Sequence, residues 1–287
     1  MKRLSVTAKR TISSVTVNIV LTIILSSIAF LVLFPLYFVL ITSLKSYTAY
    51  ITNPFGIDFA NIAFSNYAEV LMRKNILMAT LNSVIVSGFS VICMVLWTAL
   101  ASFGIGVVKF KGCGLIYFIA ISTMFFSGEM VYVPLYLLYS NMNLLGKFEV
   151  LLIPSMITLS GLGVIMGSGF SKQIPVEIHE AAFLDGANLR NVFFKIDLPM
   201  LVPILSMVAI MQFQGAWGDF FWPLITVIGN PNIYTLPLMI VGYRASDAMY
   251  FGQYCAGLTI MTVPIVLVYC FFSKYFMQGI AAGAVKG

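Results

Sequence analysis

The chain alternates long apolar stretches with short polar segments. Residues 11–44 and 75–108 contain no charged side chain, and 112–146 contain only Glu129. A helix that crosses about 30 Å of hydrocarbon needs about 20 apolar residues, because each residue adds about 1.5 Å. The pattern predicts an all-α, polytopic membrane protein with six transmembrane helices. These are expected at about 17–42, 78–105, 114–138, 150–170, 199–222 and 253–273.

Two places interrupt this pattern. Ser127-Gly128-Glu129 predicts a break in the third helix close to the external surface. Residues 220–243 carry no charge, but Gly229-Asn230-Pro231-Asn232 brings together residues that end helices. We interpret 220–243 as an external loop with short apolar pieces, and a re-entrant loop is the alternative.

Composition excludes a water-soluble domain. Apolar residues make up 60% of the chain and charged residues 9%, where a soluble domain has roughly 25% charged residues. The formal net charge of +6 is spread too thinly for a nucleic-acid surface, so we expect no nucleic-acid partner. The basic excess instead indicates how the chain is oriented in the bilayer.

Lys and Arg gather on the cytoplasmic side of bacterial and other membrane proteins. With the N-terminus inside, eleven of the 16 Lys and Arg residues fall in predicted cytoplasmic segments. We therefore expect a multi-pass protein of the cell membrane with both termini in the cytoplasm. The expected regions are an N-terminal segment at 1–16, a transmembrane domain at 17–277 and a cytoplasmic tail at 278–287.

The sequence lacks the residues that a metal site, a membrane enzyme or an ATPase would need. The four cysteines form no C-x-x-C pair and the only histidine is His179, so we expect no metal site. A membrane enzyme would need clustered titratable groups, and the charged residues lie at the predicted helix ends. The sequence has no G-x-x-x-x-G-K-[ST] loop, so an ATPase activity of this chain is not expected.

One polar insertion, at 171–198, separates the fourth and fifth predicted helices. Pro175 and Glu177 suit the first turn of a helix that runs to about Leu184, and Gly186 suits its end. Asn188 suits the cap of a second helix that ends before Pro199. The first helix presents an apolar surface that either docks in a groove of another protein or packs against the chain's own helices. This surface consists of Ile178, Ala181, Ala182 and Phe183.

The same insertion carries a recognisable spacing. Glu180-Ala181-Ala182, then Gly186, then Ile196-x-Leu198-Pro199 resembles the EAA signature of the membrane subunits of binding-protein-dependent ABC importers. Further matches are Ile174-Pro175, Trp217-x-Asp219-Phe220-x-Trp222-Pro223-Leu224, Tyr234-Thr235-Leu236-Pro237-Leu238 and Gly283-Ala284-Val285-Lys286-Gly287. Met124-Phe125 through Pro134-Leu135-Tyr136 adds another match in the third predicted helix. The resemblance covers nearly the whole chain and is strongest to the carbohydrate-uptake branch, to six-span permeases of the maltose or glycerol-3-phosphate type. His179, Phe183, Gly215 and Gly218 depart from the residues common there.

The resemblance implies a permease subunit without catalytic activity, powered by ATP and Mg²⁺ held on a separate ATPase, with no cofactor bound by this chain. The implied partners are a sibling permease that completes a heterodimer, two ATPase subunits, an extracellular solute-binding protein, the carbohydrate and the lipid bilayer. A cytoplasmic coupling helix between helices four and five would seat in the ATPase and drive alternating access. The residues implied for this contact are Glu180, Ala181, Ala182, Phe183, Leu184, Asp185, Gly186 and Ala187.

Two further groups of residues are candidates for recognition. A substrate pathway near the outer end of the fifth helix would use Gln212, Gln214, Trp217 and Asp219. A contact with the binding protein would use Asn230, Asn232, Tyr234 and Arg244. The expected substrate is a carbohydrate, an oligosaccharide above others, with a polyol or a glycerol phosphate ester as the alternative. A secondary transporter is the alternative from another class, but the sequence shows no inverted repeat and no midplane charges.

Overall fold

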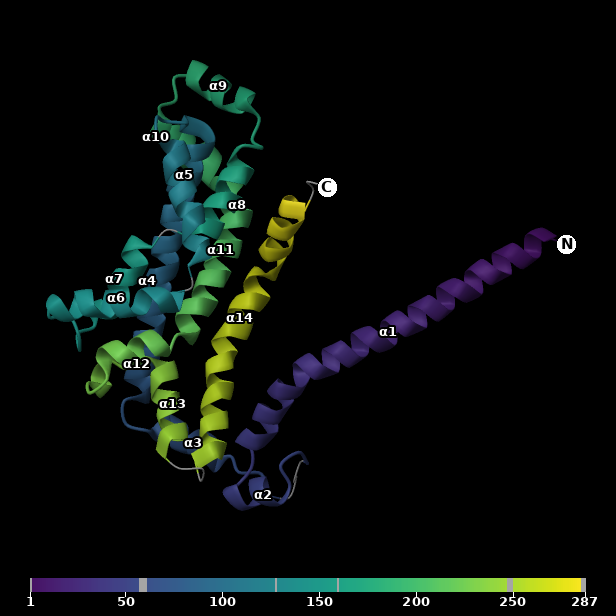
Figure 1. Ribbon diagram of the computed structural model, residues 1–287, viewed down its shortest axis with the longest axis vertical. Coiled ribbons are helices and arrows are strands. Elements are labelled where there is room, and N and C mark those ends of the chain that lie inside the picture. The colour runs from purple at the N-terminus through teal and green to yellow at the C-terminus, as the bar shows by residue number, and fades with distance from the viewer. Residues whose placement is uncertain (1, 57–60, 127, 159, 247–249, 285–287) are drawn as a thin grey trace. The chain divides into compact units, whose positions relative to one another are not determined.

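Figure 1 shows the computed structural model, which describes residues 2–56, 61–126, 128–158, 160–246 and 250–284. Side chains are described for these residues except at 2–16, 129, 243–246 and 273–284. Every regular element within these ranges is helical. The chain divides into two compact units, one formed by 1–70 with 243–259 and the other by 71–242 with 260–287.

The first unit contains α1 (Lys2–Ser43), α2 (Tyr47–Thr52) and the beginnings of α3 (Ser65–Met72) and α14 (Phe251–Ala284). The last carbonyl groups of a helix have no intrahelical donor. At the end of α1, Asn66 Nδ2 donates to the carbonyl oxygens of Ser43 and Lys45, at 2.9 and 2.8 Å. The Lys45 ammonium donates to the carbonyl oxygens of Asn53 and Pro54, both at 2.7 Å. Polar side chains thus fix the turn that follows α1.

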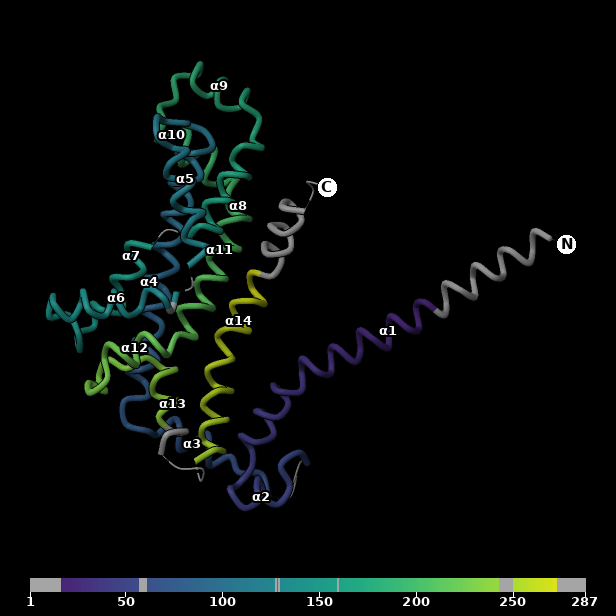
Figure 2. The backbone as a smooth tube through the Cα atoms, viewed as in Figure 1, coloured from purple at the N-terminus to yellow at the C-terminus, as the bar shows by residue number. Residues whose placement is uncertain are grey.

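The second unit is built around α4 (Ile76–Phe103), which packs against α8 (Gly161–Ser171) and α11 (Leu198–Gly218), as Figure 2 shows. The remaining α-helices are α5 (Cys113–Ser122), α6 (Gly128–Asn141), α7 (Glu149–Ile157), α9 (Val176–Leu184), α10 (Leu189–Val192), α12 (Phe221–Val227) and α13 (Leu236–Ser246). Short π-helical turns are η1 (Gly104–Val108) and η3 (Phe193–Asp197), and short 3₁₀ turns are η2 (Thr123–Phe125) and η4 (Pro231–Ile233).

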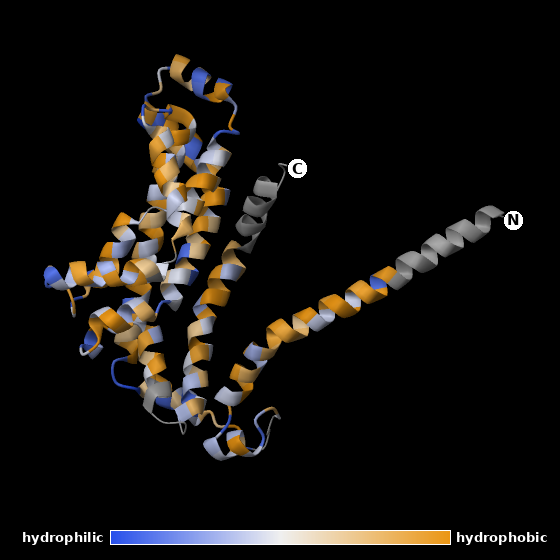
Figure 3. Ribbon diagram, viewed as in Figure 1, coloured by the Kyte–Doolittle hydropathy of each residue, from blue (hydrophilic) through white to orange (hydrophobic). Residues whose placement is uncertain are grey.

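Hydrophobic residues extend along most of the helices (Figure 3). Many of their large apolar side chains are exposed. Soluble monomers rarely expose apolar surface on this scale, whereas lipid-facing helices do. Five helical segments are long and apolar enough to cross a membrane, and a bent pair makes a sixth. The five are Val17–Ser43, Ile76–Val108, Glu149–Ser171, Leu189–Gly218 and Phe251–Phe272, and the pair is Cys113–Phe125 with Met130–Asn141. The predicted number and order of spans are therefore confirmed.

The third span is not the single helix expected at 114–138. The two parts of the bent pair meet at 105° around a break between Phe126 and Gly128. Phe126 is extended, with φ −103° and ψ 125°, so the helix cannot continue through it. The predicted break is thus correct. The side chain of Glu129 lies outside the described residues.

The fourth span, expected as one helix at 150–170, also consists of two pieces. α7 ends where Thr158 is extended, at φ −85° and ψ 124°. α8 then starts with Ser160 as its cap, whose hydroxyl accepts a hydrogen bond from Gly163 N at 3.0 Å. Because Ser160 satisfies a donor at the new helix start, the break leaves fewer unpaired backbone groups in the apolar region.

The second helix predicted in the polar insertion at 171–198 does not end before Pro199. Asn188 caps α10 as expected, accepting from Asn191 N at 2.9 Å, but α10 continues through η3 into α11. Leu198 keeps helical dihedral angles despite preceding a proline. Packing overrides the local preference here. One cluster buries Val192, Phe193, Leu201 and Leu205 of this helix with Ala99 and Phe103 of α4.

The fifth span ends at Gly218, and not at 222 as predicted. Asp219 is extended, with φ −70° and ψ 115°, and a new helix, α12, starts at Phe221. The segment expected as a loop with apolar pieces at 220–243 contains α12, η4 and α13, with the break around Gly229 and Pro231. Within its described residues it contains no helix long enough to cross a membrane.

Small residues bring α8 close to α4. A Cβ atom built on Gly167 would collide with Ser102 Oγ, and one built on Gly163 would lie 2.6 Å from Thr98 Oγ1. The pair forms a G-x-x-x-G spacing, which the sequence predicts to serve helix packing. The structure confirms this role. Gly169, on the same helix, has open space where a Cβ would lie.

Gly167 and Gly169 therefore allow a stability test within one helix. Gly167→Ala should lower the free energy of unfolding by about 1–3 kcal/mol, because the added methyl group overpacks the α4–α8 contact. Gly169→Ala is the matched control and should raise it by up to about 1 kcal/mol through helix propensity. Thermal unfolding in detergent checks both. A melting temperature that falls equally for the two variants would contradict the packing role of Gly167.

Candidate functional site

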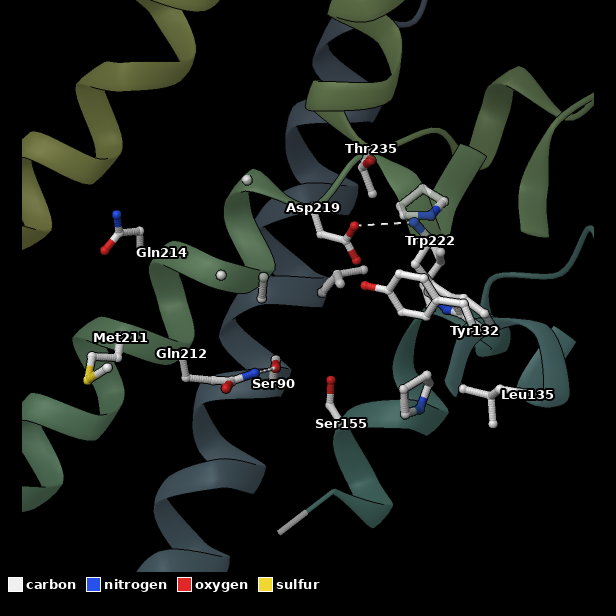
Figure 4. Close-up of a pocket in the computed structure, with 17 residues that line it drawn as sticks. Ser90, Tyr132, Leu135, Ser155, Met211, Gln212, Gln214, Asp219, Trp222 and Thr235 are labelled. Carbon is white, nitrogen blue, oxygen red and sulfur yellow. Dashed lines mark hydrogen bonds between the residues drawn. The ribbon is translucent and has the colours of Figure 1, made fainter. Parts of the chain in front are cut away.

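A cavity of about 750 Å³ lies in the second unit, beside the C-terminal end of α11 (Figure 4). Five helices supply its walls: α4, α6, α7, α11 and α12, together with Asp219 between the last two and Thr235 directly before α13. Its size falls within the range of about 300–1,000 Å³ typical of ligand pockets. The broken helices described above are what open it, because α6, α7 and α12 all begin or end beside it.

The cavity wall combines amide and hydroxyl groups. Gln212 Nε2 donates a hydrogen bond to Ser90 Oγ on α4, and Ser155 lies on the facing wall (Figure 4). Gln214 lies at the exposed edge of the cavity. Thr235 is 4% exposed, and its Oγ1 has no hydrogen-bond partner among the described residues. Such groups can donate to and accept from a hydroxyl-rich ligand.

Asp219 holds one corner of the cavity. Its Oδ1 accepts hydrogen bonds from the backbone N–H groups of Phe221 and Trp222, at 3.1 and 3.2 Å (Figure 4). A carboxylate at this position satisfies donors at the start of α12 and complements the helix dipole. Asp219 therefore orients the turn between α11 and α12 and places a negative charge on the cavity wall.

Aromatic side chains form the wall around Tyr132. Tyr132 stacks on Phe221 with ring centroids 5.4 Å apart, and its ring lies 5.6 Å from that of Trp222. Trp222 Nε1 donates to Val150 O at 3.0 Å, which ties α12 to α7. The indole is thus fixed by a hydrogen bond and by packing.

Trp217 corrects the expected substrate pathway. Gln212, Gln214 and Asp219 line the cavity, but Trp217 does not. Its side chain is 2% exposed, stacks on Phe213 and donates from Nε1 to Met261 O of α14 at 3.0 Å. Its indole therefore contacts α14 and not the cavity. It serves packing between α11 and α14.

Sequence reasoning missed four of the polar or aromatic residues that line the cavity: Ser90, Tyr132, Ser155 and Thr235. The sequence does contain a pattern that indicates Ser90. Ser83, Ser87 and Ser90 recur at helical spacing along α4, and all three are buried. A polar stripe on an apolar helix indicates a face directed at protein or water. The other three lie beside helix breaks, whose geometry the sequence pattern does not fix.

The residues expected to contact a binding protein have internal partners in most cases. Asn82 Nδ2 donates to the carbonyl oxygens of Asn232 and Tyr234, both at 3.0 Å. Asn230 Nδ2 donates to Gly146 O at 3.3 Å. These bonds anchor the segment around η4 to α4 and to the turn before α7. The side chain of Arg244 lies outside the described residues.

The segment around α9 has one packed side and one exposed side. Ala182 and Ala187 pack against the cluster that joins α4 to α11. Phe183 is 43% exposed and Leu184 88% exposed, and Glu180, Ala181, Asp185 and Gly186 are also exposed. Of the apolar surface predicted from the sequence, Ala182 thus packs internally, whereas Ala181 and Phe183 are exposed.

The end of α9 has the geometry expected of a glycine-terminated helix. Gly186 has φ +82°, a region that favours glycine, and its N–H donates to Phe183 O at 3.1 Å. Ala187 N donates to Ala182 O at 2.9 Å. These bonds hold the turn through the backbone, and no side-chain hydrogen bond of Asp185 is found among the described residues.

Known proteins resemble this chain over much of its length. A probable ABC transporter permease protein of Bacillus subtilis, YurM, is 32% identical over 207 residues, 72% of this chain and 69% of YurM. The permease protein AraQ of an arabinooligosaccharides transport system from Halalkalibacterium halodurans is 27% identical over 270 residues, 93% of this chain and 96% of AraQ. No family model matches the chain.

The fold has also been seen in a solved structure. A chain in the crystal structure of a bacterial ABC transporter involved in the import of the acidic polysaccharide alginate superposes with a TM-score of 0.77 at 22% identity, over 90% of this chain and 96% of that chain. Because YurM is 32% identical over 72% of this chain, the chain belongs to the permease proteins of ABC transporters. It is a membrane protein and, as a permease subunit, not itself an enzyme.

The capping role of Asp219 can be tested by its stability effect. Asp219→Ala should lower the free energy of unfolding by about 1 kcal/mol, because α12 loses the acceptor at its start, whereas Asp219→Asn should leave it nearly unchanged. Asp185→Ala removes an exposed carboxylate without a side-chain hydrogen bond and is the matched control. Thermal unfolding in detergent measures all three. Equal melting temperatures for Asp219→Ala and wild type would refute the cap.

Proposed function

We propose that this chain is the permease subunit of an ATP-driven importer that carries an oligosaccharide across the cell membrane by alternating access. The observation that carries the substrate class is the cavity beside α11, in which amide, hydroxyl and carboxylate groups face an aromatic wall. Sugar hydroxyl groups both donate and accept hydrogen bonds, and sugar C–H faces pack against aromatic rings. AraQ, whose transport system is named for arabinooligosaccharides, supports the same class.

The energy for transport comes, in this proposal, from two ATPase subunits that bind ATP and Mg²⁺. The exposed side of α9 supplies the contact, with Leu184 and Phe183 as apolar anchors and Glu180 as a partner for a basic side chain. A helix that lays an apolar side in a groove is a recurring mode of recognition. An ion pair at its edge contributes more to register than to affinity.

Two further partners complete the importer. A sibling permease forms the second half of the pathway, and the lipid-exposed surfaces of the helices leave room for it. An extracellular solute-binding protein delivers the sugar to the segment around η4. Asn232 is the exposed residue among the described candidates there, since the backbone of this segment is held from inside by Asn82.

ATP-dependent uptake by proteoliposomes that contain the chain, its ATPase, its sibling permease and the binding protein tests the function. Labelled arabinotriose, maltotriose, glycerol and glycerol 3-phosphate form the substrate panel. Wild type should take up a trisaccharide only with ATP. Gly186→Pro should reduce uptake at least tenfold, because proline cannot adopt φ +82° and has no N–H for the bond to Phe183 O.

Gly186→Asn is the control for that variant, because asparagine tolerates the left-handed region and keeps the N–H. It should retain most of the uptake. Uptake that persists without any ATPase would mean a secondary transporter. Uptake confined to glycerol or its phosphate ester would overturn the proposal that the substrate is an oligosaccharide.

The cavity residues give a second test in the same vesicles. Gln212→Leu should lower trisaccharide uptake about tenfold relative to ATP hydrolysis, because a sugar hydroxyl group loses its amide partner inside the cavity. Ser90→Ala removes only the group that accepts from Gln212 and should have a smaller effect. If both variants transport like wild type, the cavity does not contact the sugar.

A further inference from the structure

α9 has few connections to the rest of the second unit. Val176, Glu177, Glu180, Ala181 and Leu184 are exposed, and its packed side rests mainly on Ala182. Among the described residues, the only side-chain hydrogen bonds that α9 makes come from His179. The position of α9 relative to the membrane helices therefore depends strongly on His179.

His179 meets Asp197, eighteen residues further along the chain. Its Nε2 lies 3.2 Å from Oδ2 and 3.3 Å from Oδ1 of that carboxylate. Both side chains are buried, with His179 6% exposed and Asp197 fully enclosed. One ring nitrogen thus faces both oxygens of a buried carboxylate.

No other side chain offers Asp197 a hydrogen bond among the described residues. Lys195 is exposed, Arg190 lies over the Phe194 ring, and Lys172 lies over the Tyr117 ring. Separating the pair would leave a carboxylate unpaired in a buried site, which is strongly unfavourable. α9 and the segment that carries Asp197 are therefore held together more firmly than apolar packing alone would hold them.

Asp197 is the last residue of η3, which continues directly into α11. Gln212 lies fifteen residues further along this helix, about 22 Å at 1.5 Å per residue. α11 stays helical across Pro203 from Leu198 to Gly218. A displacement applied at Asp197 is thus applied to the helix that carries the cavity wall.

We propose that His179 and Asp197 are a positioning pair that makes α9 and α11 move as one body, so that movement of α9 on its partner reaches the cavity. This inference rests on the proposed function, in which the partner of α9 is an ATPase. Neither residue contacts the transported sugar. The pair acts by keeping two helices in fixed relation.

The experiment measures uptake of labelled arabinotriose and ATP hydrolysis in the same proteoliposomes of the complete importer. His179→Asn and Asp197→Asn should each lower the sugar taken up per ATP hydrolysed at least fivefold, because ATP-driven movement of α9 no longer reaches α11. The exchanged variant, His179→Asp with Asp197→His, should recover to within twofold of wild type. Glu149→Gln, the same carboxylate-to-amide change at an exposed site on α7, should behave as wild type.

A distance measurement keeps the pair testable without any sugar. Spin labels at Leu184→Cys on α9 and Val202→Cys on α11, in a chain whose four native cysteines are replaced, report the relation of the two helices in the purified full chain. We expect one narrow distance distribution that broadens in Asp197→Asn and narrows again in the exchanged variant.

The outcomes separate the two proposals. Wild-type vesicles that take up no sugar with ATP overturn the proposed function, while the spin-label distances still decide on the pair. Unchanged uptake per ATP and unchanged distances in both single variants overturn the pair alone. Uptake and hydrolysis that fall in parallel, with no recovery in the exchanged variant, show a role in folding or assembly only and also overturn it.

Discussion

The structure depends on one constraint, that each backbone polar group in an apolar surrounding needs a partner. Unbroken helices meet it by themselves, but three predicted spans or their extensions are broken. At two of these breaks a polar side chain supplies a missing bond, because Ser160 caps α8 and Asp219 caps α12. α4 does the same for the segment before α13: Ser83 Oγ accepts from Leu236 N at 2.8 Å, and Asn82 donates to two carbonyl groups just before that helix. These breaks are therefore structured features.

The same breaks create the cavity. A bundle of continuous helices packs its interior closely, and here Gly163 and Gly167 bring α8 against α4 with no space for a methyl group. Toward the other end of α4 the helices stop, turn and restart, so that Tyr132, Ser155 and Asp219 come from three different elements to one space. The second unit thus has a closely packed part, where α8 meets α4, and a part with broken helices that contains the cavity.

The sequence could predict the features that rest on local chemistry. Charge-free stretches located the spans, Pro175 and Glu177 located the start of α9, and Gly186 its end. It could not predict features that depend on packing. Leu198-Pro199 has the local signal of a helix end, yet burial of Val192 and Leu201 against α4 carries the helix through. Trp217 has the chemistry of a sugar contact, but its place on the turn of α11 directs it to α14.

His179 shows why the two kinds of information must be combined. In the sequence it departs from the residues common in the resembling family and directly precedes the residues implied to contact the ATPase. In the structure it points inward, to a carboxylate that the motif alone does not connect with it. In the proposed function α9 docks on a partner and also moves the membrane helices, so it needs an attachment on each side. The exposed Leu184 is available to the partner, and the buried His179, five residues earlier on α9, holds the helix to α11. In this proposal a helix of nine residues therefore contacts its partner on one side and the permease on the other.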